Sequence, residues 1–70
     1  MRYIVLDGKY AANIEYIKYI SRDITSRYTY ICFNDRDLAE WDVDESFNWV
    51  LGELLHGTKH VYVTSFKEYK

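Results

Sequence analysis

A run of carboxylates is the part of this sequence with the clearest chemical potential. The segment "NDRDLAEWDVDE" (34–45) holds six of the chain's 11 acidic residues and one base, Arg36. The stretch carries a net charge of −5, which leaves about +3 for the rest of the chain. Grouped carboxylates can ligate a metal, transfer protons or pair with a basic partner. Residue types and their spacing distinguish among these three roles.

Metal ligation finds little support in the residue spacing. Asp35-x-Asp37 opens like a calcium loop, but position 39 is Ala, no Gly follows, and no Glu stands at the twelfth place. His56 and His60 are four residues apart, but a predicted helix end and a predicted strand separate them. We therefore expect no metal and no cofactor.

The sequence also lacks a complete set of catalytic residues. Cys32 is the single cysteine, so the chain has no internal disulfide. Cys32 and His60 could form a nucleophile pair only if the strands that carry them were neighbours. No serine stands in an elbow-like glycine context, and no glycine-rich loop could cradle a phosphate. Without a nucleophile, base and charge stabiliser in one pattern, we predict a protein that is not an enzyme.

The first half of the chain predicts a strand, a helix and a strand. "RYIVL" (2–6) is an apolar run closed by Asp7-Gly8, which predicts a central strand ending in a turn. Residues 9–24 are expected to form an amphipathic helix, and 28–33 a strand. The helix prediction rests on four apolar residues near one helical face: Tyr10, Ile14, Ile17 and Ile24. In the strand, Ile31 and Phe33 share one side, and Tyr28, Tyr30 and Cys32 share the other.

The acidic stretch is predicted to begin as a hairpin. Residues 34–37 have a turn composition, and 38–43 alternate, with Ala39, Trp41 and Val43 on one side and Leu38, Glu40 and Asp42 on the other. Residues 44–57 form the next predicted helix, capped by Asp42 or Asp44 and ended by Gly57. Asp42 with Glu45 fits a capping-box variant. A strand over 59–66 closes the chain, with Val61 and Val63 on one side and His60, Tyr62, Thr64 and Phe66 on the other.

This order predicts one small α+β domain over residues 1–70. The arrangement β-α-β-β-α-β is ferredoxin-like, with a four-stranded antiparallel sheet and both helices on one face. If 38–43 stays a loop, the alternative is a compact three-stranded β-α-β-α-β fold. Both helices on one face would leave the other face rich in tyrosine, including Tyr28, Tyr30 and Tyr62, and such a face favours an interface.

Two resemblances accompany this fold. An aromatic ferredoxin-like sheet is similar to the RNA-recognition module, but residues 38–43 carry Glu40 and Asp42 where that module has basic residues. "MRYIVLD" (1–7) is similar to the start of the Cas2-type nucleases, and this resemblance implies a metal-ligand role for Asp7. The basic residues expected after that Asp are missing, because Lys9 stands alone.

Protein binding is the leading hypothesis. The small size of the chain and its acidic, tyrosine-rich composition resemble those of phage and mobile-element anti-defence proteins of the anti-CRISPR or anti-restriction type. We expect an inhibitor or adaptor in the cytoplasm, or in the host-cell cytoplasm if the protein is viral. The sequence has no long apolar run, so we expect no membrane contact. It has no excess of basic residues, so we expect no direct contact with nucleic acid. The alternative is a homodimer packed through the tyrosine-rich face. The predicted partner-binding residues are Asp35, Asp37, Glu40, Asp42, Trp41, Trp49, Tyr28, Tyr30 and Tyr62.

Overall fold

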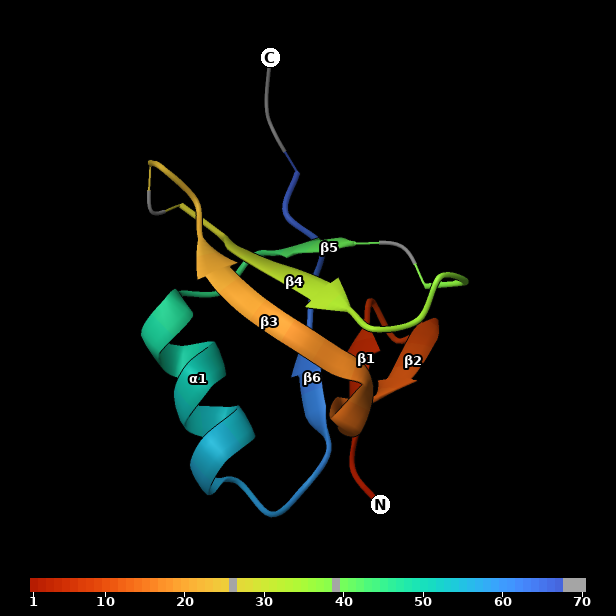
Figure 1. Cartoon of the computed structure of the whole chain (residues 1–70). Helices are drawn as coiled ribbons and strands as arrows, with labels where there is room; N and C mark the ends of the chain where they lie inside the picture. Colours follow the sequence, from red (N-terminus) through yellow and green to blue (C-terminus); the bar gives the residue numbers. More distant parts are fainter. Residues whose placement is uncertain (26, 39, 68–70) are drawn as a thin grey trace.

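The computed structural model describes residues 1–25, 27–38 and 40–67. Within these ranges the chain forms six strands, one α-helix and one short 3-10 helix, and the strands make two three-stranded sheets (Figure 1). The predicted ferredoxin-like fold is therefore wrong, and so is the three-stranded alternative. No helix in the described part of the chain is long and apolar enough to span a bilayer.

The first sheet is built around the N-terminal strand, in the order β2-β1-β6. β1 (Tyr3–Leu6) pairs antiparallel with β2 (Tyr10–Asn13) and parallel with β6 (Val61–Val63). Asp7 and Gly8 have φ values of 56° and 67°, and the Lys9 amide donates to the Leu6 carbonyl at 3.0 Å. Two successive left-handed residues are typical of tight hairpin turns, where Asp-Gly is a favoured pair. The predicted central strand and its turn are confirmed.

The helix predicted over 9–24 is wrong. This segment forms β2, the 3-10 helix η1 (Ile14–Tyr16) and β3 (Ile17–Arg22), and Ile24 is fully exposed. A β-bulge between Ile17 and Tyr19 breaks the two-residue alternation, so Ile17 and Ile20 both pack against the core three positions apart. The residues behind the helix prediction belong instead to separate elements: Tyr10 to β2, Ile14 to η1 and Ile17 to β3. Ile and Tyr are abundant in this segment, and both favour strands.

The second sheet is an antiparallel meander in the order β3-β4-β5. β4 (Thr29–Phe33) and β5 (Trp41–Val43) form the predicted hairpin, and both Trp41 and Val43 are buried as expected. β5 is shorter than the predicted 38–43. Leu38 packs partly against the core instead of lying on the wet side, and Ala39 lies outside the described residues.

The single α-helix, α1 (Phe47–His56), ends at Gly57 as predicted, but its start differs. Ser46 is the N-cap and accepts a hydrogen bond from the Trp49 amide at 3.2 Å, and the first turn contains no acidic residue. Ser, like Asp, satisfies an otherwise unpaired amide at this position. The predicted caps at Asp42 or Asp44, and the capping box with Glu45, are therefore wrong.

The C-terminal segment joins the two sheets along their edges. An isolated bridge pairs Val43 with Ser65. The Asp44 amide donates to the Thr64 carbonyl at 2.8 Å, and the Phe66 amide donates to the Asp42 carbonyl at 2.9 Å. The sheets and α1 enclose a core made of these buried residues: Ile4, Leu6, Ala12, Ile31, Phe33, Trp41, Val43, Val50, Val61 and Val63.

Arg2 connects the start of β1 to the end of α1. Its guanidinium donates to the carbonyls of Glu53 at 2.8 Å, Leu54 at 3.3 Å and Lys59 at 2.9 Å. A cation at this helix end satisfies unpaired carbonyls and complements the helix dipole. The close approach leaves no room at Gly57, where an added Cβ would lie 2.5 Å from the Glu53 oxygen and 2.8 Å from the Arg2 guanidinium.

We expect Gly57→Ala to lower the free energy of unfolding by about 1–3 kcal/mol, because the new methyl group would push on backbone and displace Arg2. Gly52→Ala is the matched control, since nothing lies within 4 Å of its Cβ position and Ala favours a helix by about 0.5–1 kcal/mol. Urea denaturation of both variants measures the difference. A Gly57→Ala protein as stable as Gly52→Ala would contradict this packing.

Candidate functional site

The outer face of the β3-β4-β5 sheet carries Tyr30 and Cys32, two of the three residues expected together on one side of residues 28–33. Along β4, Thr29, Ile31 and Phe33 are buried, whereas Tyr30 and Cys32 are half-buried and point to the opposite side. Two neighbours on this side follow from the strand register: Tyr19 pairs with Cys32, and Asp42 pairs with Tyr30. These are the first members of what we call the acidic tyrosine face, which consists of Tyr19, Tyr30, Cys32, Glu40 and Asp42.

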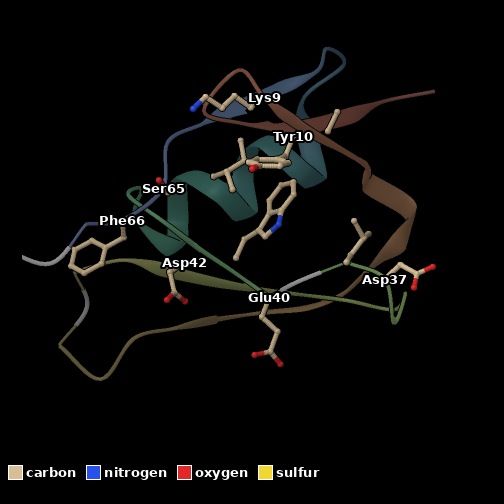
Figure 2. Close-up of a pocket in the computed structure, with 11 residues that line it drawn as sticks. Lys9, Tyr10, Asp37, Glu40, Asp42, Ser65 and Phe66 are labelled. Atoms are coloured by element: carbon tan, nitrogen blue, oxygen red, sulfur yellow. The ribbon is translucent and has the colours of Figure 1, made fainter.

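Glu40 is tied directly to this face. Its carboxylate accepts a hydrogen bond from the Tyr30 hydroxyl, and this bond, with partial burial and the negative charge, raises the pKa of Tyr30 to about 12. The pKa of Tyr19 is also raised, first by its hydrogen bond with Cys32. In Figure 2 the carboxylates of Glu40 and Asp42 point away from Tyr10, toward this outer side. Part of the predicted acidic surface, Glu40 and Asp42, and part of the predicted tyrosine surface, Tyr30, therefore form one surface.

The other acidic residues of 34–45 have different surroundings. Asp35 shapes the loop, because its Oδ1 accepts from the Asp37 amide at 2.9 Å and its carbonyl accepts from the Leu38 amide at 3.1 Å. Asp37 and Asp44 are exposed, and Glu45 is half-buried. The Glu45 carbonyl accepts a hydrogen bond from the buried Thr29 hydroxyl at 2.8 Å. Asp35 is thus a turn residue, with Asp37 the freer carboxylate beside it.

The aromatic residues predicted to contact a partner are dispersed. Trp41 is 7% exposed and packs edge-on against Phe33, so it supports the site from inside. Trp49 is half-exposed on α1, and Tyr62 is exposed on β6 of the other sheet. The Tyr28 ring stacks on Phe66 with centroids 4.5 Å apart. Among the predicted tyrosines, Tyr30 is the one whose pKa is raised by Glu40 of the acidic segment.

A groove of about 730 Å³ lies between the two sheets, and sequence reasoning missed it. Figure 2 shows Lys9 and Tyr10 on one side, Asp37 at one end, and Ser65 with Phe66 at the other. Its walls come from the β1–β2 hairpin, the start of β5 and the C-terminal segment. These pieces are far apart in sequence, so no local pattern could indicate the groove.

Asp7 has a structural partner in place of the metal implied by the nuclease resemblance. Its Oδ1 accepts from the Ser65 amide at 2.9 Å, and its Oδ2 accepts from the Ser65 hydroxyl at 2.7 Å. These bonds lower the pKa of Asp7. Nowhere in residues 1–25, 27–38 and 40–67 do three His, Cys, Asp or Glu side chains gather closely enough to hold a metal.

The pKa of Asp7 predicts acid sensitivity of the contact between the β1–β2 turn and the C-terminal segment. Because the folded-state pKa is lowered, this stabilisation is present above the unfolded value of 3.8 and is lost as the pH falls through the folded value. Asp7→Asn keeps a residue that tolerates positive φ but removes the charge. Its melting temperature should lie below the wild-type value near pH 6 and converge with it near pH 2. An unchanged difference at both pH values would contradict the prediction.

Tyr30 should be the tyrosine most directly affected by Glu40. With ¹³Cζ-labelled tyrosine, NMR should show Tyr30 ionising at about pH 12, and Glu40→Gln should move its pKa back toward the ordinary value of 10. Since the folded-state pKa is raised, the linked stabilisation is complete below pH 10 and is lost as the pH rises toward 12. Tyr30→Phe assigns the signal. A pKa that Glu40→Gln does not change would exclude the hydrogen bond.

Because the comparisons with known proteins find no match, a functional conclusion rests on the geometry of the site. No protein family, no curated protein and no solved structure matches this chain. The residues placed together in space are Tyr19, Tyr30, Cys32, Glu40 and Asp42 on one sheet face. That face can accept hydrogen bonds and attract positive charge, and its rings can cover apolar surface. These are binding properties, and they define the candidate site.

Proposed function

We propose that this chain is a non-enzymatic protein-binding inhibitor or adaptor whose acidic tyrosine face binds a basic partner surface. The observation that carries the proposal is the strand register that places Asp42 opposite Tyr30, with the Glu40 carboxylate near enough to raise the pKa of Tyr30. It places two carboxylates and a half-buried aromatic ring on the side of a sheet that faces away from the core. Tyrosine is enriched at protein interfaces because its ring is apolar and its hydroxyl is polar.

The carboxylates are available to a partner. Across the described residues, the structure records no ion pair between Lys or Arg and Glu40 or Asp42, and both side chains are exposed. The Tyr30 hydrogen bond restrains Glu40 before binding, so less side-chain entropy is lost when a complex forms. Complementary charge also accelerates encounter and disfavours wrong partners.

The partner class follows from this chemistry. Surfaces that bind nucleic acid are a common basic target, because they neutralise phosphates with Lys and Arg. A small acidic protein that occupies such a surface would act as an anti-defence protein of the anti-CRISPR or anti-restriction type, in the cytoplasm of a host cell. The carboxylates form a local patch, and the net charge is only −2, so the proposal involves one face and not whole-surface mimicry of nucleic acid.

The test is affinity capture from the native host with three baits, quantified by mass spectrometry. Wild type should retain a protein with a basic nucleic-acid-binding surface, and Glu40→Lys/Asp42→Lys should retain at least about tenfold less, because attractive pairs become repulsive. Asp35 is left unchanged because it organises the loop. Added duplex DNA should release the partner by competing for the same surface.

Glu15→Lys is the matched control. Glu15 is exposed in η1, in a different part of the chain, so this charge reversal should leave capture unchanged. Circular dichroism verifies that all three baits are folded. Equal retention by wild type and Glu40→Lys/Asp42→Lys would refute the role of the acidic tyrosine face. Retention that DNA does not reduce would refute the nucleic-acid-binding surface as the target.

A further inference from the structure

The other sheet carries a surface of opposite character. A hollow of about 400 Å³ lies at the edge of the β2-β1-β6 sheet, where the residues before β1 meet the segment between α1 and β6. Among residues 1–25, 27–38 and 40–67, no carboxylate side chain lines it. Its lining consists of Met1, Arg2, Thr58, Lys59, His60 and Tyr62, and we call it the basic hollow.

Three of these side chains can donate hydrogen bonds to an anion. Arg2 uses three of its five N–H groups on backbone carbonyls, so two remain. Lys59 is exposed and forms no side-chain contact with a carboxylate. The Nδ1 atom of His60 accepts from the Tyr3 amide at 3.0 Å, which leaves the proton on Nε2 as a donor.

Aromatic rings border the same hollow. Tyr62 is 67% exposed on the outer side of β6, because its strand neighbours Val61 and Val63 are directed into the core. The rings of Tyr3 and His60 lie 5.5 Å apart, which fixes the imidazole beside the strand. An exposed ring between cations is the combination that binds a nucleobase by stacking and its phosphate by charge.

Tyr62 also borders a second hollow, of about 490 Å³, on its other side. This one contains Lys9 and Lys67, together with the carboxylates Asp7 and Glu45. Asp7 accepts two hydrogen bonds from Ser65 and keeps its negative charge, so this hollow attracts an anion less strongly than the basic hollow does. Two hollows with two cations in each, separated by an exposed ring, suit an extended chain better than an isolated anion.

We propose that this face binds single-stranded nucleic acid, with Tyr62 stacking on a base and Lys59 and Arg2 contacting a phosphate. The overall charge of −2 argued against such binding, but that charge is an average over two unlike surfaces. The acidic tyrosine face belongs to the β3-β4-β5 sheet, and the basic hollow belongs to the β2-β1-β6 sheet. The site is independent of the proposed protein-binding function.

The experiment measures fluorescence anisotropy of a labelled oligothymidylate of about ten nucleotides at about 20 mM salt. Wild type should bind, and binding should weaken as salt rises, because phosphate contacts release counterions. Tyr62→Ala and Lys59→Glu should each reduce affinity at least about fivefold. Both residues are exposed, so the variants should remain folded, which circular dichroism verifies.

Tyr16→Ala and Lys18→Glu are the matched controls, because both residues are exposed on other elements. They should bind like wild type. Glu40→Lys/Asp42→Lys should bind at least as tightly as wild type, because it gains positive charge, so loss of protein capture and loss of nucleic-acid binding can be told apart. No binding by wild type, or binding that Tyr62→Ala leaves unchanged, would overturn the proposal. Adenosine monophosphate binding as tightly as the oligonucleotide would also overturn it, since an extended strand would then add nothing.

Discussion

The edge-to-edge pairing of the C-terminal segment with β5 is the contact on which the architecture depends. Backbone hydrogen bonds from Asp44 to Thr64 and from Phe66 to Asp42 connect two sheets of only three strands each. Ser65, at the centre of this pairing, also donates two hydrogen bonds to Asp7. A three-stranded sheet buries little apolar surface alone, so the shared core requires that the sheets be held together.

This connection also gives the molecule two unlike surfaces. Each sheet directs its apolar side chains into the common core and its remaining side chains outward. The outer side of β3-β4-β5 gathers Glu40, Asp42 and tyrosine, and the β2-β1-β6 sheet carries Arg2 and Lys59 at its edge. A near-neutral chain can therefore present an acidic surface to one partner and a basic surface to another.

Local patterns predicted those elements whose causes are themselves local. The Asp7-Gly8 turn, the inward Ile31 and Phe33 of β4, and the helix ending at Gly57 were all predicted correctly. The segment after Gly8 was not, because Tyr10, Ile14 and Ile17, whose spacing suggested one helix, belong to β2, η1 and β3. Strand pairing with β1 and β4 then decided the conformation, and pairing depends on residues distant in sequence.

The sequence by itself determined the composition of the candidate site: a carboxylate-rich segment, a strand with tyrosines on one side, and Trp41 turned inward. Only the tertiary structure decided that Glu40 meets Tyr30, that Asp35 holds a turn, and that Ser46 caps the helix. The physical reason is that alternation fixes which side a residue faces, whereas strand register and sheet order fix its neighbours. Strand register and sheet order are set by packing across the whole chain.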